Sequence, residues 1–394
     1  MKRAFTLIEL VFVIVVLGII SMFGADLYTK IYRSYVHVRA VNQLENRTQN
    51  ALMLITNKLE NRIKSSTIAR EIGDANDAAN FVPISDLTDP KYDVLEWIGQ
   101  SVETRNIGNR MPGWSGFISL HQLRDQTWPR DANNAGFIGD TRNAFNMVSL
   151  GSNFPQVNQI VRNLRATTYR NPSNDASVAL IFRIVTNDAS PTSVNIGYGY
   201  DGTFQADGSN RVLVAVGTPS NAGGGNINGE TINIAQYPGN PHNDDHQEFS
   251  EQYYLAHTAY AIVPTNVEIY TKDQAGNLSK NFDLVLRYNY RPWSNIKKDT
   301  RSFRNASSAL LAEDVSLFRF KNDNGSVALK LCMRDDGRNF DPAELDLNVC
   351  KAQCTNENYA KRLCSSGSHI FYHHCSDYGD YGIVYSFYDC PRCK

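Results

Sequence analysis

The chain has 394 residues with 39 basic and 40 acidic side chains, so its formal net charge is −1. Such a balance creates no field that attracts polyanions, and we expect no nucleic-acid partner. Hydrophobic residues make up 42% of the chain, which is typical of a globular protein. A membrane segment must therefore be local, and the length allows several structural units or one large domain with insertions.

The N-terminus combines a short basic start with one long apolar run. Lys2 and Arg3 precede the stretch 5–23, FTLIELVFVIVVLGIISMF, in which the only charged residue is Glu9. A helix over 5–25 is just long enough to cross a hydrocarbon core of about 30 Å. The two basic residues favour a cytoplasmic N-terminus, which places the rest of the chain outside the cytoplasm.

A cleaved secretory signal peptide is the simpler alternative for this segment. Signal peptides have uncharged apolar cores of about 7 to 15 residues, whereas this run is longer and contains Glu9. A carboxylate inside a membrane helix costs about 2.5 to 3.5 kcal/mol on insertion scales, so we expect Glu9 to have a partner. A Glu9 side chain that merely reaches the headgroup region is the remaining alternative.

The stretch KRAFTLIELVFVIVVLGII resembles the class III signal and anchor helix of type IV prepilins and type II secretion pseudopilins. The resemblance implies that a prepilin peptidase cuts between Ala4 and Phe5, removing the leader 1–4, and that Phe5 is then N-methylated. Most family members have Gly where this chain has Ala4. In such an assembly, the buried Glu9 carboxylate needs a counter-charge, and the amine of Phe5 on an adjacent subunit is the expected one.

This resemblance also implies a function and a location. The expected protein is a minor pilin or pseudopilin of a type IV pilus or type II secretion machine, not an enzyme. It would pass once through the bacterial inner membrane, with a periplasmic head, and later join the fibre near its tip. Expected partners are other pilins, the prepilin peptidase and the inner-membrane assembly platform. A pilin-anchored adhesin or cargo-binding head and a membrane-tethered enzyme are the alternatives.

Beyond the anchor, apolar residues recur at spacings of three and four. The pattern predicts that the helix continues through 26–72 with one apolar stripe, which packs on a globular head. Proline first occurs at Pro83, and Gly73 with Asp74 should end the helix. A break near Gly24 is the alternative, because a helical glycine costs about 1 kcal/mol. The stripe comprises Leu27, Ile31, Val38, Val41, Leu52, Ile55, Leu59 and Ile63.

Strand signals dominate the chain after residue 170. We interpret 73–170 as a loop-rich insertion, because turn residues fill it. Residues 171–335 contain β-branched and aromatic runs bounded by turn residues, which predicts an antiparallel β head. A long helix followed by such a sheet is an α+β fold of pilin-like architecture, with the helix covering one face. The expected strands are 178–185, 194–200, 211–216, 231–234, 258–263, 267–270, 282–290, 315–320 and 327–333.

The strand–turn–strand stretch 307–334 resembles the end of the head in J-type minor pseudopilins and W-type minor pilins. Its turn, Asn322-Asp323-Asn324-Gly325, is a strong hairpin signal. Together with the large head, this looser resemblance favours a minor subunit located at the fibre tip over a repeating one.

Cysteine is concentrated in 336–394, which we interpret as a Cys-rich C-terminal module. Six of the seven cysteines lie there, whereas Cys332 stands apart. An even set outside the cytoplasm predicts three disulfides in a module too small for its own core. The disulfide candidates are Cys350, Cys354, Cys364, Cys375, Cys390 and Cys393.

Metal and redox chemistry are the alternatives for this module. Three histidines lie among the cysteines, and the chain ends with one Cys-x-x-Cys motif, so zinc is conceivable. A second acidic and histidine-rich stretch, PHNDDHQEF, lacks a known ligand spacing, and we interpret it as a solvated loop. We therefore expect no metal and no cofactor. The histidines and acids in question are His369, His373 and His374, and His242, Asp244, Asp245, His246 and Glu248.

Overall fold

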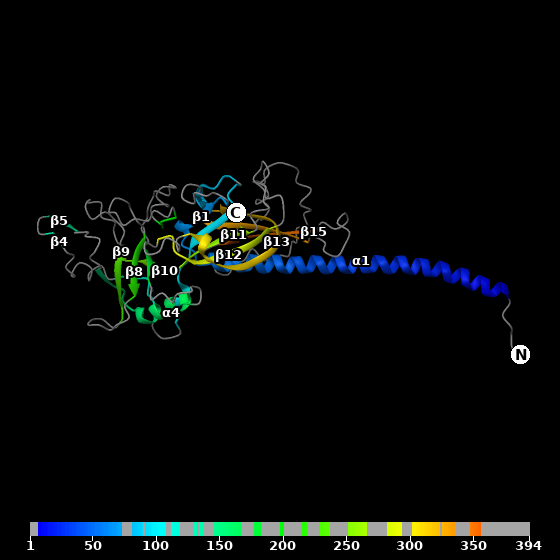
Figure 1. The fold of residues 1–394 in the computed structure, drawn as a ribbon, viewed down its shortest axis with the longest axis horizontal. Helices are drawn as coiled ribbons and strands as arrows, with labels where there is room; N and C mark the ends of the chain where they lie inside the picture. The colour runs from blue at the N-terminus through cyan, green and yellow to red at the C-terminus, as the bar shows by residue number, and fades with distance from the viewer. Residues whose placement is uncertain are drawn as a thin grey trace.

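In the computed structural model, one long helix projects from a head built of two antiparallel sheets (Figure 1). The fold is therefore α+β, as the sequence predicts. The structure describes residues 7–72, 81–89, 91–107, 112–118, 130–131, 134–137, 145–166, 177–182, 198–200, 214–219, 229–236, 251–265, 282–293, 302–323, 325–335 and 347–355.

The helix α1 spans Leu7–Glu60 without a break, which confirms the single continuous helix and excludes the alternative of an interruption near Gly24. Its end is also earlier than the predicted residue 72. The Arg62 guanidinium donates to the carbonyl of Leu59 (3.0 Å), which satisfies an open end of the helix, and to the carbonyl of Gly325 (2.7 Å). After α1 the chain enters the main sheet, where β1 pairs with β2 and β3 in place of further helical hydrogen bonds.

The main sheet has eight strands in the order β15-β14-β13-β12-β11-β3-β1-β2, and all neighbours are antiparallel. The second half of α1 packs across β13, β14 and β15. The strand bounds are β1 Ile68–Arg70, β2 Phe81–Pro83, β3 Val94–Ile98, β11 Ala259–Thr265, β12 Phe282–Tyr290, β13 Ser307–Asp323, β14 Ser326–Asp335 and β15 Leu347–Thr355. Short 3-10 turns are η1 Lys64–Ser66, η2 Ile84–Asp86 and η5 Phe303–Asn305.

The second sheet has five strands in the order β10-β7-β8-β9-β6 and lies at the end of the head farthest from the start of α1 (Figure 1). This sheet has a separate hydrophobic core of aromatic and aliphatic side chains, which includes Trp114 and Phe154. Its bounds are β6 Phe145–Val148, β7 Val178–Phe182, β8 Val214–Pro219, β9 Thr231–Gln236 and β10 Tyr253–Ala256. Beside it are α2 Val102–Arg105, α4 Phe154–Ala166 and the hairpin of β4 Arg130–Asp131 with β5 Asn134–Phe137.

The expected strands are confirmed at β7, β8, β9, β11, β12, β13 and β14. The hairpin turn predicted at 322–325 joins β13 to β14, and Gly325 has a φ of +83° there. Of the expected strand 194–200, the described residues 198–200 form a turn instead. The expected strand 267–270 lies outside the described residues.

Three expected boundaries are corrected by the sheet topology. The interval 73–170 is more than an insertion. It supplies β2 and β3 to the main sheet, and β6 to the second sheet, beside which α4 lies. The interval 171–335 is divided between both sheets. The interval 336–394 does not begin as a separate module, because β15 pairs with β14 along its whole length.

Removing buried packing between α1 and the sheet should destabilise the head. Leu52 is 1% exposed, and its neighbour Met53 is 44% exposed. We expect Leu52→Ala to lower the free energy of unfolding by about 2 to 5 kcal/mol, because it leaves a cavity under the sheet. Met53→Ala is the matched control and should change it by about 0.5 kcal/mol or less. Chemical denaturation of the full chain in detergent measures both, and equal effects would contradict the packing described.

Candidate functional site

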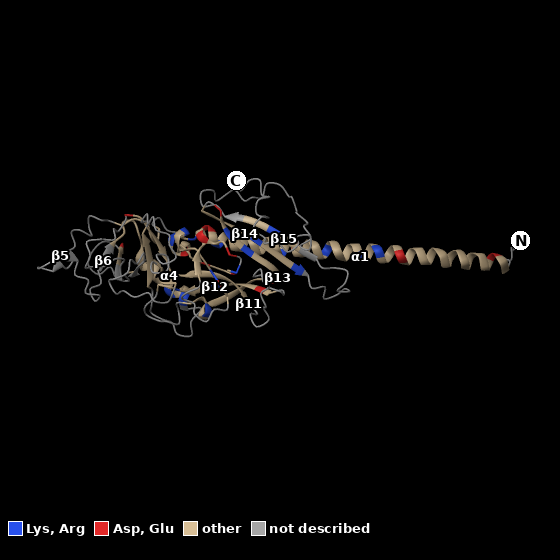
Figure 2. Cartoon of the chain, turned by 90° about the horizontal axis from the view of Figure 1, so that it is seen from above, with Lys and Arg blue, Asp and Glu red and all other residues tan. Residues whose placement is uncertain are grey.

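The N-terminal half of α1 is an apolar surface that the rest of the chain leaves uncovered. Every residue from Leu7 to Tyr35 is exposed, and no Lys, Arg, Asp or Glu occurs between Glu9 and Asp26 (Figure 2). By length and composition, α1 can cross a membrane, and a signal sequence near the N-terminus would have the same properties. This much exposed apolar surface needs a lipid or protein partner in order to be stable.

Glu9 lies in the first turn of α1, where the positive end of the helix dipole favours a carboxylate. It is exposed on the helix surface and therefore accessible to a neighbouring molecule. The predicted cleavage residues Ala4 and Phe5 and the orienting residues Lys2 and Arg3 lie outside the described residues. Their roles, and the pairing of Glu9 with a neighbour's amine, stay predictions.

The apolar stripe expected to pack on the head divides into two parts. Residues from Val41 onwards are buried, whereas Leu27, Ile31 and Val38 are 53–60% exposed. Of the stripe expected to pack on the head, the part from Val41 onwards does so. On the buried part of the helix, β15 contributes an ion pair in which Lys351 Nζ lies 3.2 Å from Glu45 Oε1.

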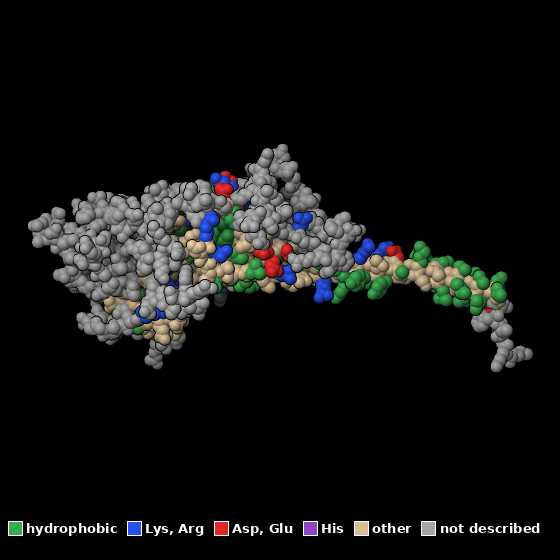
Figure 3. Space-filling model, viewed as in Figure 1, with side chains coloured by type: hydrophobic (Ala, Val, Ile, Leu, Met, Phe, Trp, Pro, Cys, Tyr) green, Lys and Arg blue, Asp and Glu red, His purple; other side chains and the backbone are tan. Residues whose placement is uncertain are grey.

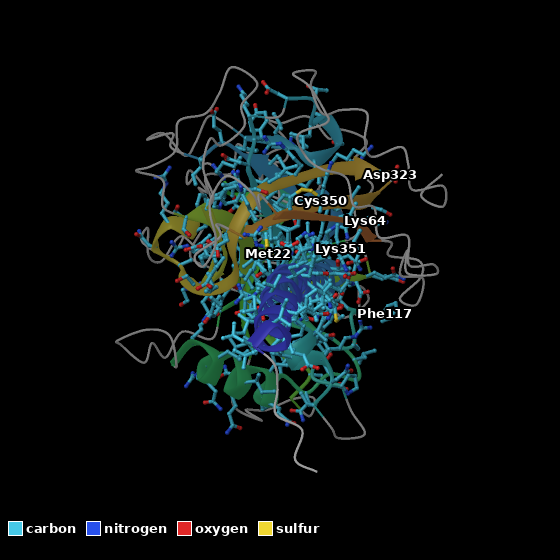
Figure 4. All side chains as sticks on the ribbon, turned by 90° about the vertical axis from the view of Figure 1, so that its right-hand side faces the viewer. Met22, Lys64, Phe117, Asp323, Cys350 and Lys351 are labelled. Atoms are coloured by element: carbon cyan, nitrogen blue, oxygen red, sulfur yellow. A yellow bond between two sulfur atoms is a disulfide. The ribbon has the colours of Figure 1, made fainter. Side chains whose placement is uncertain are left out.

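The predicted cysteine set is also rearranged. Cys332, which stood apart in the sequence, forms a disulfide with Cys350 (Figure 4). These two residues are directly opposite each other on β14 and β15, so strand pairing brings them together. Cys354 lies further along β15, and Cys364, Cys375, Cys390 and Cys393 lie outside the described residues. Because Cys350 pairs with Cys332, the six tail cysteines do not form three pairs among themselves. Five of the seven cysteines are not part of this disulfide.

A buried polar cluster lies where the two sheets join, and no sequence motif predicted it. His257 connects β10 of one sheet directly to β11 of the other, and its Nδ1 lies 2.7 Å from Ser101 Oγ. Thr104 also donates to Ser101 Oγ (2.7 Å), and Arg165 donates to the carbonyl of His257 (3.3 Å). Ser101 and His257 are both buried, so their hydrogen bond satisfies polar groups that have no access to solvent.

A second buried cluster fixes the central strands of the main sheet. Arg70 Nε on β1 donates to Glu96 Oε2 on β3 (3.0 Å), and Tyr290 Oη on β12 donates to Glu96 Oε1 (2.9 Å). Burial, together with the Glu96 carboxylate, raises the pKa of Tyr290 well above its usual 10. The tyrosine therefore stays protonated and remains a donor to the carboxylate.

Within the described parts of the chain, no group of three or more His, Cys, Asp or Glu side chains is placed to hold a metal ion. The histidine and acid clusters of 242–248 and 369–374 lie outside those parts. Comparison with known proteins adds no relative, because no family model, curated protein or solved structure matches the chain.

The disulfide should contribute to the stability of the sheet edge. A closed loop of 18 residues stabilises by about 3 kcal/mol in the chain-entropy description. We expect the double variant Cys332→Ser with Cys350→Ser to lose roughly that amount in chemical denaturation under oxidising conditions. Under reducing conditions it should differ little from the unaltered chain. A loss of equal size in both conditions would contradict this assignment, because the serines themselves would then be the cause.

Acid should weaken the junction between the sheets. Burial, together with the nearby charges of Arg165 and Lys58, lowers the pKa of His257 from 6.5 to about 3. The unfolded chain therefore gains a proton near pH 6.5 that the folded chain accepts only near pH 3, so stability falls as pH drops through this window.

We expect protonation of His257 in the unfolded chain to lower the free energy of unfolding by about 2 kcal/mol between pH 7 and pH 5. Denaturation curves at the two pH values measure the difference. In His257→Gln the difference should shrink by that amount, whereas His37→Gln on the exposed part of α1 should leave it unchanged. An unchanged difference in His257→Gln would show that another group titrates.

Proposed function

We propose that this chain is a pilin-like minor subunit, anchored in the bacterial inner membrane and assembled into a type IV pilus or a type II secretion pseudopilus. The observation that carries the proposal is the continuity of α1. One helix joins an exposed apolar half, with Glu9 in its first turn, to a half that is buried under the head. Its leading sequence resembles the prepilin anchor, whose apolar helix is retained after processing.

The physical logic favours a retained anchor over a discarded signal peptide. A secretory signal peptide requires no rigid connection to the protein that follows it. Here the helix runs from the apolar part into the head with no loop between them. A signal-peptide cut after the apolar run, near residue 25, would therefore divide a continuous helix. A cut before Phe5 leaves α1 whole.

Glu9 is the residue that gives the anchor specificity in this proposal. In the membrane, a carboxylate within the apolar run is costly and needs a compensating cation. After the proposed cut, the amine of Phe5 on an adjacent subunit supplies that cation at a matching depth. The pair sets the axial register of one subunit against the next, whereas the apolar side chains hold the helices in the membrane.

A second candidate function is a binding head displayed on the same anchor. The second sheet favours it, because this sheet has its own core and lies at the end of the head most distant from the anchor. Phe117, which is exposed, pairs with Gln252 beside β10 of the second sheet. Fibres that assemble normally in a Phe117→Ser variant but no longer attach to a surface or cargo would favour this candidate.

Replacing Glu9 should block assembly without blocking membrane insertion. We expect Glu9→Leu to insert normally but to enter fibres on the order of tenfold less, because one charge-assisted pair is lost. Glu9→Asp, which keeps the charge, is the matched control and should retain part of the incorporation. Quantitative immunoblotting of sheared fibres against membranes measures the ratio.

Mass spectrometry of the unaltered protein tests the other half of the proposal. The expected mature chain begins with N-methylated Phe5. An intact Met1, or a mature end after residue 25, would overturn the proposal together with its assignment of Glu9.

A further inference from the structure

The main sheet ends on one side in a long, straight strand. β15 is the outermost strand of the eight, and within the described part of the chain no strand pairs with its outer side. It has nine residues, and all nine pair with β14 without a shift of register. Such an edge presents a row of backbone N–H and C=O groups with which another extended chain can pair.

The other edges of this sheet have features that discourage pairing. β2, at the opposite end, has only three residues and ends in Pro83. β13 pairs with β14 only from Val315 onwards, and the edge that this leaves beside its first half ends in a register shift next to Asp314, whose φ is +56°. Short strands, proline and bulges all hinder the addition of a further strand. β15 has none of these features.

A charged side chain on an edge strand can also hinder pairing. The only one on β15 is Lys351, and its Nζ is turned to α1, where it lies 3.2 Å from Glu45 Oε1 and 3.3 Å from Gln49 Oε1. Figure 4 shows Lys351 on the side of β15 that faces α1 and Cys350 on the other side. The charge is therefore directed at the helix and does not protect the edge.

The spacing of Cys332 and Cys350 shows which backbone groups of β15 face outward. Their Cα atoms are 4.0 Å apart, which is typical of an antiparallel pair that exchanges no hydrogen bonds, because hydrogen-bonded pairs are about 5.5 Å apart. The N–H and C=O groups of Cys350 therefore point away from β14. Since the register has no shift, every second residue has the same orientation, namely Asn348, Ala352 and Cys354.

This edge is fixed in place from both faces of the sheet. On one face the disulfide ties Cys350 to β14, and on the other the Lys351 ammonium group is bound to Glu45 of α1. A strand that is already held in its paired conformation loses little conformational entropy when a partner binds. The outer edge of β15 is therefore a preorganised surface for strand addition.

A strand added to β15 would lie along the flank of α1. Lys351 reaches Glu45 and Gln49, so these two residues mark the side of the helix nearest β15. Rotation by about 100° per residue brings an exposed and uncharged surface next, further from the sheet. It consists of Asn42, Asn46 and Met53. Figure 3 shows that part of the surface of α1 stays uncovered where the helix runs along the head.

The uncharged flank of α1 restricts the side chains of an added strand. A charge beside these residues would lose hydration without gaining an ionic partner, whereas apolar or hydroxyl side chains can pack there. On the opposite face of the sheet, Ala352 is exposed and small, so it leaves space for side chains of any size.

We propose that the outer edge of β15 binds an extended segment of another polypeptide by strand addition, centred on Ala352, with uncharged side chains turned to α1. Backbone hydrogen bonds supply the affinity, and the flank of α1 supplies the selectivity. This inference goes beyond the proposed function and is independent of it, because it concerns the head and neither the membrane nor Glu9.

Hydrogen exchange of the full chain in detergent tests whether the edge is open. The amide of Ala352 should exchange on the order of a hundredfold faster than those of Lys351 and Gln353, because only the latter two are bonded to β14. Equal protection of the three amides would show that another part of this chain or a second copy already covers the edge. That result would overturn the proposal.

Binding can be measured with a synthetic copy of β14. The probe is the peptide 326–334 carrying Cys332→Ser, whose side chains alternate between an uncharged face and a face with Lys330 and Arg334. A second probe has the same side chains but is N-methylated at every amide, so it has no backbone donors. By fluorescence anisotropy, we expect the first probe to bind at least about tenfold more tightly, a difference of about 1.4 kcal/mol. Equal binding of the two probes would contradict strand addition.

Two variants at one position locate the contact. Ala352→Pro removes an outward N–H and should weaken binding of the first probe at least about tenfold, whereas Ala352→Ser keeps the N–H and should leave binding unchanged. Proline is tolerated on an edge strand where its nitrogen faces outward, so both variants should keep the unfolding temperature of the head within a few degrees. Equal binding of the probe to both variants would overturn the proposal.

Photo-crosslinking identifies the occupant of the edge. Benzoylphenylalanine at Ala352 in the full chain should form an adduct with the first probe. An adduct within the chain or with a second copy, in the presence of excess probe, would overturn the proposal. Maturation at Phe5 and the effect of Glu9→Leu are measured separately, so the proposed function can hold when strand addition fails, and the reverse.

Discussion

The packing of the second half of α1 against the main sheet determines the rest of the architecture. Leu52, Ile55 and Leu59 are buried almost completely, and this face anchors the helix to β13, β14 and β15. Because an α-helix is stiff, fixing one half also fixes the direction of the other half. The apolar half is thus held away from the head as a rod, and its exposed surface is available to a membrane and to other helices.

A buried polar cluster lies at the connection between the two sheets of the head. Buried donors and acceptors are costly unless they are satisfied, so Ser101, Thr104, His257 and Arg165 bind one another across the elements that meet there. The chain passes from β10 to β11 through this cluster. The end of β10 and the start of β11 are therefore tied to α2 and α4 by these hydrogen bonds.

The surface of α1 divides by chemistry into three parts along its length. The first is apolar on all sides, which suits lipid and the packed interior of a fibre. The second, from Leu27 to Val38, has exposed apolar residues on one side and the ion pair of Asp26 with Lys30 on the other. The third is buried against the sheet. One uninterrupted helix can in this way make three kinds of contact in sequence, and each requires a different pattern of side chains.

The sequence by itself determined the features that depend on local chemistry. The apolar run with Glu9, the long helix and most strands of 171–335 follow from periodicity and turn residues, which act over a few neighbouring positions. Only the tertiary structure decided which long-range partners meet. It ended α1 at Glu60, placed β3 in the middle of the main sheet and paired Cys332 with Cys350.

The reason for this difference is physical. A strand of five residues such as β3 gives a weak local signal and is stabilised by neighbours that lie more than 150 residues away in the chain, at β11. Likewise, helical spacing shows that Leu27, Ile31 and Val38 form an apolar face, but it contains no information on where the sheet stops. Burial begins at Val41, which is 8% exposed, whereas Val38 is 53% exposed, and the structure alone specifies this boundary.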